Sequence, residues 1–459
     1  MIQLGKRHGF CTLLAVAALS VSANALAQPA PAPEPAPPPA PTDPAAPPAT
    51  PAPADTPPPV PMAAPAPAPE PPKTVFPTMA GNNLRLSEIF SIRPGVFLQF
   101  WGQAAQDQFP KADGTSGDFS KNLYLRRSRF YLAGAIGKDV TWFMLWETGN
   151  LGLATLNADG SVNRNFTTFN FNDAWLDYKI NKNLSIQAGL MLIPFTRNIL
   201  QSTATYWTID IGAVSASYIA ATQTSTLRDT GVQVKINAAD GHLEARGLVS
   251  QGVKIPDPEG GARTPGKNDP RLTGYIQYNF LEPEAGYVFN GQYFGKKAVA
   301  GVAVGGDYQS INSDNPYFAT SATAFATIPL KGADAKNGGD EIGGQVEYLH
   351  FHGGKVPPAS GLGKRDGVLV EAGYYNKNAK LSVFGKFEGV FIDGASKILN
   401  TQLYGGGLKY FLAESAANIM LQYNYIQFPN QPDTFTMPLP ATARTAASSI
   451  QLQIQLGYF

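Results

Sequence analysis

The last residues of the chain, 448–459, read SSIQLQIQLGYF, and apolar and polar side chains alternate along them. Successive side chains of an extended strand point to opposite faces. One face of this segment is apolar and the other carries glutamines; the two sets are Ile450, Leu452, Ile454, Leu456 and Tyr458, and Gln451, Gln453 and Gln455. The same alternation recurs in 228–237, 367–376 and 417–428. These segments predict strands that separate an apolar environment from a polar one.

Sixteen runs of this kind follow one another from residue 92 onward, with almost no helical periodicity. They are 92–104, 122–136, 139–149, 168–180, 184–194, 228–237, 242–253, 271–280, 298–309, 321–330, 340–352, 367–376, 379–392, 401–412, 417–428 and 448–459. Even strand numbers are typical of bacterial outer-membrane barrels, and a sheet in lipid must close because lipid cannot satisfy a free strand edge. The sequence therefore predicts an all-β fold, a 16-stranded antiparallel transmembrane β-barrel over 92–459 with a wet lumen.

The connections between these runs alternate in length. The short ones are 137–139, 181–183, 239–241, 376–378 and 414–416, and the long ones are 105–121, 150–167, 195–227, 254–270 and 429–447. A barrel threaded from the periplasm has short periplasmic turns and long outer loops. The longest connection, 195–227, contains Tyr206, Trp207 and Asp210, and we expect it to fold inward and constrict the lumen. The alternative is an exposed surface loop or a trimer contact.

The N-terminus predicts secretion. A basic cluster at 6–8 precedes an apolar stretch at 11–21 and an A-x-A cleavage site at 25–27, so 1–27 is expected to be a signal peptide. Its removal takes away Cys11, the only cysteine of the chain. The mature protein is then expected to have no disulfide and no cysteine-based metal site.

A proline- and alanine-rich segment, 28–73, follows and holds 22 of the 39 prolines. It cannot bury a core, so we expect a disordered periplasmic linker. It is a plain spacer or, alternatively, a tether that contacts the cell wall. Residues 74–91 are expected to lead into the barrel. Charged residues are only 15% of the chain, which is few for a soluble protein, and the net charge of +1 gives no indication of nucleic-acid binding.

Basic residues are concentrated in 125–130, which reads LRRSRF. Arg127 and Arg129 have the lumen-facing phase, whereas Arg126 takes the opposite phase near the outer end of its run. Four more basic residues have lumen phase or bracket the long connection: Lys235, Arg246, Arg197 and Arg228. Inward arginines favour anions, so we expect all seven of these basic residues, Arg126 included, to line the pore and supply its positive field. The alternative is a balanced lumen, because carboxylates also have inward phase: Asp173, Asp177, Glu244, Glu347, Glu371 and Glu388.

No pattern in the chain predicts chemistry. His350 and His352 share a face but lack a third metal ligand, and His242 near Ser250 belongs to no catalytic motif. We therefore expect no enzymatic activity, no metal and no cofactor.

The arginine-rich run 125–130, followed by 134–139, resembles the second strand and turn of the phosphate-selective porin O and P family. Residues 173–178, 188–195 and 228–232 are similar to further family segments in the same order. The resemblance covers roughly 92–459. It implies a trimeric outer-membrane porin with an inward-folded third loop and a lumen in which arginines bind phosphate or polyphosphate. The residues that match the family's basic positions are Arg126, Arg127, Arg129 and Arg228.

Phosphate-binding members carry basic residues in the third loop, whereas 198–227 contains no Lys or Arg. The expected function is therefore an outer-membrane diffusion porin for small hydrophilic solutes, with weak anion preference. We expect a homotrimer in the outer membrane of a Gram-negative cell, with lipid and small solutes or anions as partners. The alternatives are a phosphate- or polyphosphate-specific channel and a structural envelope anchor that uses 28–73 as its arm.

Overall fold

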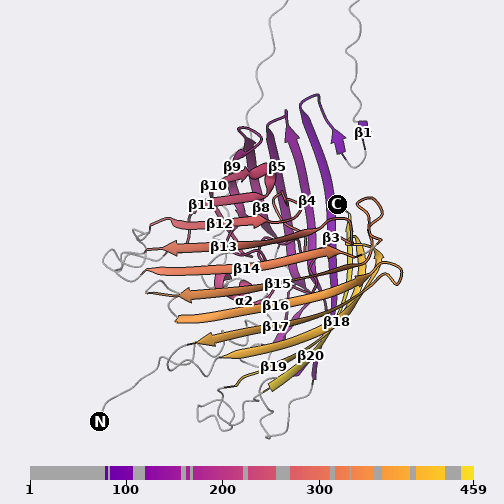
Figure 1. The fold of residues 1–459 in the computed structure, drawn as a ribbon. Coiled ribbons are helices and arrows are strands. Elements are labelled where there is room, and N and C mark those ends of the chain that lie inside the picture. The colour runs from indigo at the N-terminus through magenta and orange to yellow at the C-terminus, as the bar shows by residue number, and fades with distance from the viewer. Residues whose placement is uncertain are drawn as a thin grey trace, which may run out of the picture. The chain divides into compact units, whose positions relative to one another are not determined.

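The computed structural model describes residues 78–80, 83–106, 119–156, 162–165, 169–220, 226–254, 269–310, 316–330, 332–354, 364–392, 400–429 and 446–458. Sixteen strands form a barrel (Figure 1). They are β3 (Phe90–Gln106), β4 (Phe119–Ile136), β5 (Val140–Leu151), β8 (Asn170–Lys179), β9 (Leu184–Leu192), β10 (Arg228–Ala238), β11 (Leu243–Ser250), β12 (Arg271–Asn279), β13 (Val299–Gln309), β14 (Tyr317–Pro329), β15 (Glu341–His352), β16 (Lys364–Asn376), β17 (Leu381–Ile392), β18 (Thr401–Ala413), β19 (Ala417–Gln427) and β20 (Ala446–Tyr458). The other elements are β1 (Thr78–Ala80), β2 (Asn83–Arg85), β6 (Ala154–Leu156), β7 (Val162–Arg164), α2 (Ala213–Ala220) and the 3₁₀ turn η1 (Ala239–Gly241).

Each barrel strand pairs antiparallel with its neighbours in sequence, and β20 pairs with β3 to close the ring. The closing register runs from Ser449 opposite Ala105 to Tyr458 opposite Val96. Every predicted run corresponds to one barrel strand, so the predicted fold is confirmed. The expected lead-in contributes the β1–β2 hairpin, which pairs with β3. The expected signal peptide, 1–27, and linker, 28–73, lie outside the described residues.

The predicted division into two faces is also present. In β20, Gln453 and Gln455 are each 1% exposed, whereas Ile450 is 47% exposed. Across the barrel many large aliphatic and aromatic side chains are exposed, and the buried inward positions are more often polar than apolar, with Gln, Asn, Thr, Glu and Arg prominent. This is the inverse of a soluble barrel, because the outer surface is the apolar one. Among the described helices, none has the length and apolar character needed to cross a membrane.

The expected asymmetry of the connections holds at most positions. Tight turns join β4 to β5, β8 to β9, β10 to β11, β16 to β17 and β18 to β19, and the middle parts of four long connections lie outside the described residues. A connection of intermediate length, 330–340, joins β14 to β15 at the same end as the tight turns, and the clearest exception is the connection from β12 to β13, residues 280–298. The antiparallel strand order places this connection at the same end of the barrel as the tight turns, where a short connection is expected, yet it is long. Its residues Glu284, Phe289 and Gln292 are buried, so this segment folds into the barrel.

Candidate constriction site

The long connection from β9 to β10 lies inside the barrel. Ile193, Phe195 and Leu200 are completely buried, in one cluster with Leu349 and Phe351 of β15. Residues 280–298 meet the connection there: the Phe289 N–H donates to the Leu200 carbonyl (2.8 Å), and the Ser202 N–H donates to the Phe289 carbonyl (2.7 Å). Two chain segments that enter from opposite ends of the barrel therefore run side by side in the lumen.

Inward carboxylates hold the long connection in place. Glu347 accepts from the Asn198 N–H (3.3 Å) and the Ser215 hydroxyl (2.5 Å), Glu371 accepts from the Thr208 hydroxyl (3.1 Å), and Glu388 accepts from the Val214 N–H (3.1 Å). Lys409 of β18 donates to the Tyr206 carbonyl (2.9 Å) from the same side of the lumen. The inward phase predicted for these acids is correct, but most of their partners are loop groups rather than cations on a facing wall.

Trp207 lies in a recess made by two glycines of neighbouring strands. Gly343 of β15 and Gly373 of β16 are register partners. A Cβ atom at Gly373 would lie 2.3 Å from a ring carbon of Trp207, and one at Gly343 would lie 2.9 Å from another. Trp207 is 1% exposed as a result. The absence of side chains at these two positions is what allows the indole to dock against the barrel wall.

The variant Gly373→Ala should displace Trp207 and loosen the connection. Since the new methyl group would overlap the indole ring, amide hydrogen exchange in 193–212 should accelerate by about tenfold, because local opening then costs less free energy. Hydrogen-exchange mass spectrometry measures this. Gly385→Ala on the lipid-facing side of β17, where only ordinary contacts surround the added atom, is the matched control. Equal exchange in the two variants would contradict the role of the recess.

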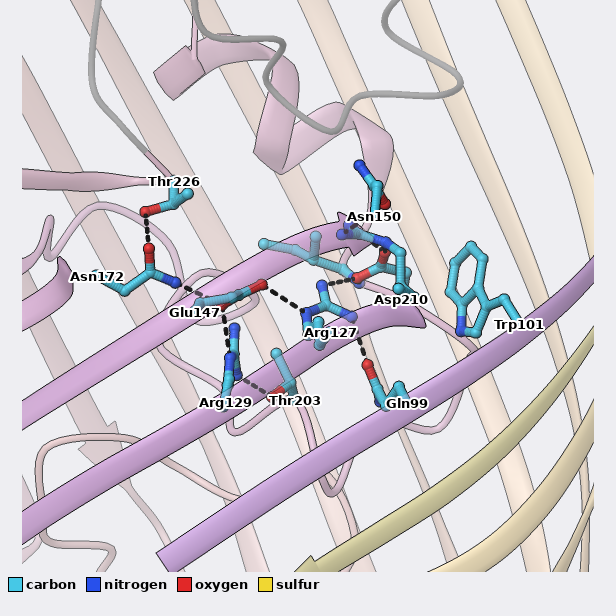
Figure 2. A network of polar contacts seen from close by, with 12 residues as sticks. Gln99, Trp101, Arg127, Arg129, Glu147, Asn150, Asn172, Thr203, Asp210 and Thr226 are labelled. Atoms are coloured by element: carbon cyan, nitrogen blue, oxygen red, sulfur yellow. Dashed lines mark hydrogen bonds and ion pairs between the residues drawn. The ribbon is translucent and has the colours of Figure 1, made fainter. Parts of the chain in front are cut away.

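Asp210 ties the tip of the connection to the arginine-rich strand β4. Arg126 donates to one carboxylate oxygen through Nε (3.1 Å) and Nη2 (2.8 Å), and Arg127 donates to the other (2.5 Å). Figure 2 shows the contact between Arg127 and Asp210 from close by. Burial raises the pKa of Asp210, but the two arginine charges, with hydrogen bonds from Arg127 and the Ile211 N–H, outweigh it and hold that pKa well below its usual range.

Arg126 reaches Asp210 because β4 contains a bulge. The pairing with β3 passes from Gln99 opposite Arg127 to Phe100 opposite Leu125, so Arg126 has no partner position. The expected opposite phase of Arg126 is therefore wrong: the extra residue turns its side chain inward.

Two further arginines lie beside this pair. Arg129 of β4 donates to Glu147 of β5 (2.6 Å) and to the Thr203 hydroxyl of the long connection (2.7 Å). Arg228, at the start of β10, pairs with Asp173 of β8 (3.1 Å). Asn172 also donates to Glu147, so the acid is held from both sides (Figure 2).

These side chains line a cavity of about 720 Å³ between the two inward segments and the wall formed by β3, β4, β5 and β8. Its charged lining residues are five arginines and two carboxylates: Arg93, Arg126, Arg127, Arg129 and Arg228, and Glu147 and Asp173. Asp210 lies behind Arg126 and Arg127 as a third acid. Positive charges therefore exceed negative charges around the cavity. Tyr206 also lines it.

Three predicted basic residues lie elsewhere. Arg197 is buried and pairs with Glu284 of 280–298 (2.6 Å). Arg246 pairs with Glu244 and donates to the carbonyls of Gly286 and Tyr287, and Lys235 pairs with Asp177; neither is part of the cavity lining. The structure thus gathers Arg126, Arg127, Arg129 and Arg228 at the cavity and places Arg197 and Arg246 where they hold the segment 280–298.

The sequence analysis did not identify Arg93 or the segment 280–298. One feature of the sequence could have identified 280–298. The segment is long at a position where the alternation of short and long connections predicts a short turn. Arg93 lies near the start of β3, at the end of the barrel where the tight turns are, and is the second residue of the predicted run 92–104. Nothing in its position marked it as a cavity residue. Among the described residues there is no group of metal-ligating side chains that could hold an ion.

Residues 100–268 match the model of the phosphate-selective porin O and P family, which confirms the resemblance over these residues. No curated protein matches the chain. Similar solved structures include OmpT of Vibrio cholerae in its trimer form, at 10% identity, covering 81% of this chain and 100% of that one, with a TM-score of 0.47. OmpF of Salmonella typhi in complex with daunomycin is 13% identical, covers 80% of this chain and 98% of its own, and has a TM-score of 0.47. The outer membrane channel DcaP of Acinetobacter baumannii is 12% identical, covers 81% of this chain and 99% of its own, and has a TM-score of 0.46. Similarity at this level assigns no function.

Proposed function

We propose that this chain, whose residues 100–268 match the phosphate-selective porin O and P family, is an outer-membrane channel through which small hydrophilic solutes diffuse, with a preference for anions. The observation that carries the proposal is a closed barrel with an apolar exterior and a polar interior in which positive charges surround the cavity. Rings of arginine side chains favour anion passage, and no reaction chemistry is needed for diffusion.

The preference is weak rather than specific for phosphate. Arg126, Arg127, Arg129 and Arg228 each already pair with a carboxylate. A phosphate ion would have to compete with those carboxylates for the same donors. At these four arginines the cavity acts through its excess of charge rather than through vacant donors.

The proposal includes a homotrimer, an N-terminal signal peptide and location in the outer membrane. The exposed apolar band of the barrel supports a membrane location, and the family match supports the outer membrane.

The zero-current potential of the purified, refolded protein in a planar bilayer under a KCl gradient tests the function. We expect the sign that corresponds to a faster chloride than potassium flux. The potential should fall toward zero at high salt because surface and lumen charges are screened. A potential of cation sign would contradict the anion preference. Half-block by micromolar phosphate would favour the phosphate-specific channel, and a folded barrel without conductance would favour the envelope anchor.

A further inference from the structure

The cavity has a second chemical feature besides its arginines. Aromatic side chains from four strands and from 280–298 line it: Phe97, Tyr131, Phe143, Trp175 and Tyr287. The ring centroids of Phe143 lie 5.7 Å from Tyr131 and 5.5 Å from Trp175, and Trp175 lies 4.8 Å from Tyr287. Tyr131, Phe143, Trp175 and Tyr287 form one continuous aromatic patch along the cavity wall, and Phe97 lines the cavity beside Arg129.

The register of the strands places charge on two sides of this patch. Arg129 lies opposite Phe97 on β3, and its guanidinium is 5.8 Å from the centre of that ring. Farther toward the periplasmic end, Ala133 of β4 lies opposite both Arg93 of β3 and Phe143 of β5. Arg93 is therefore two strands away from Phe143, about 10 Å between backbones. Arg129 therefore lies beside the Phe97 ring, and Arg93 lies near the Phe143 end of the aromatic patch.

Arg93 differs from the other arginines of the cavity in its pairing. Arg126, Arg127, Arg129 and Arg228 have carboxylate partners, whereas in the described part of the chain no carboxylate forms an ion pair with Arg93. It is exposed and lines the cavity. An anion that enters can use its donors without displacing an acid.

The aromatic patch is held in shape by its own contacts. The Tyr287 hydroxyl donates to Asp173 and accepts from the Leu192 N–H (2.7 Å), so the ring is fixed at the meeting point of the two inward segments. The Tyr131 ring covers Gly95, where a Cβ atom would lie 1.9 Å from a ring carbon, and its hydroxyl donates to the Tyr458 carbonyl (3.0 Å). A ligand ring would meet a preformed apolar surface.

We infer that the aromatic patch and Arg93 form a binding subsite for organic anions with a flat apolar body, of which aromatic monocarboxylates are the simplest class. The inference rests on the proposed channel function and names its solute class. A ring stacked on the patch gains contact area and favourable ring geometry, while the carboxylate takes paired donors from a guanidinium. Inorganic phosphate can use only the second of these contacts.

Block of the chloride current by benzoate, acetate and inorganic phosphate tests the subsite in a planar bilayer. We expect half-block by benzoate at about one tenth of the acetate concentration, since one aromatic contact contributes roughly that factor. Phe143→Leu should raise the half-blocking benzoate concentration about fivefold and leave that of acetate within about twofold. Phe171→Leu is the matched control, because Phe171 of β8 stacks on Trp146 and is 48% exposed on the outer face.

A second variant keeps the test independent of packing around Phe143. Arg93→Gln alters an exposed side chain and should weaken block by benzoate and acetate alike, by about fivefold. Equal block by benzoate and acetate in the unmodified protein would overturn the subsite, as would a Phe143→Leu variant with unchanged benzoate block. Absence of any current would instead contradict the channel function itself, so the two failures are distinguishable.

Discussion

Asp210→Asn should raise the chloride-to-potassium permeability ratio about fourfold. The substitution removes the acid that two cavity arginines share and leaves their charges uncompensated. A unit charge about 10 Å from a permeating ion changes the energy of that ion by about 0.4 kcal/mol in water, which is about twofold in an equilibrium. Because chloride and potassium respond in opposite directions, their ratio changes about fourfold. The asparagine can keep a hydrogen bond to one arginine, so the connection should stay near its place. Zero-current potentials of the two proteins measure the change.

The control is Asp340→Asn, the same chemical change in a connection away from the cavity. Asp340 accepts from the Lys377 N–H (2.8 Å) and does not line the cavity. Its variant should keep the permeability ratio of the unmodified protein. A ratio that changes equally in both variants would show that Asp210 has no special role in the lumen.

The pH dependence of this effect follows from the low pKa of Asp210. A carboxyl with a lowered pKa in the folded state stabilises that state above its unfolded pKa of about 3.9, and the contribution disappears as pH falls through the folded value. The contact between Asp210 and the arginines is therefore intact at both pH 7 and pH 4. The fourfold difference between Asp210→Asn and the unmodified protein should persist over that window, whereas convergence of the two at pH 4 would contradict the depressed pKa.

The strands were predictable because the membrane imposes a rule on every residue of a barrel. Lipid outside and polar groups inside enforce strict alternation, and 448–459 reveals both faces in a few residues. The predicted boundaries agree with the strands to within a few residues at most positions. Arg126 was misplaced because a bulge adds a residue without any mark in the hydrophobic pattern.

The interior of the lumen was less predictable, because its contacts join residues far apart in sequence. The inward phase of Glu347 and Glu371 was visible, but nothing in the sequence shows that they accept from Asn198 and Thr208 rather than from cations. The sequence also gives no sign of the recess at Gly343 and Gly373, because glycine in a strand can equally mark a bulge or a close backbone approach. The sequence pattern predicts that the interior is polar, but only the folded structure shows which interior groups pair with one another.

Arg197 and Glu284 join the two inward segments through a deeply buried ion pair. Both carboxylate oxygens accept from the guanidinium (2.6 and 3.0 Å), and each side chain is 2% exposed. Arg197 also lies 3.6 Å from the centre of the Phe325 ring. Burial disfavours the charged guanidinium, but pairing with Glu284 outweighs burial and raises the pKa of Arg197, so the pair stays ionised.

Arg197→Met should lower the free energy of unfolding by about 3–5 kcal/mol, because it leaves the buried Glu284 carboxylate without its cationic partner. Urea titration of the purified barrel measures this change. Since the long connection and 280–298 would lose a shared anchor, the single-channel current should also become noisier. The exposed pair of Lys296 and Glu414 provides the comparison, and Lys296→Met should cost less than about 1 kcal/mol.

The double variant Arg197→Met, Glu284→Met separates the cost of an orphaned charge from the value of the pair. Replacing both members of a buried ion pair by apolar residues of similar volume is often neutral, because the desolvation penalty disappears together with the attraction. We therefore expect the double variant to recover stability to within about 1 kcal/mol of the unmodified protein and to restore a quiet current. If the double variant were as unstable as Arg197→Met, the guanidinium itself would be required, through its contacts with Gln277 and Phe325. If the single variant were already neutral, water would reach Glu284, and the two segments would be held together mainly by the backbone pairing of Phe289 with Leu200 and Ser202.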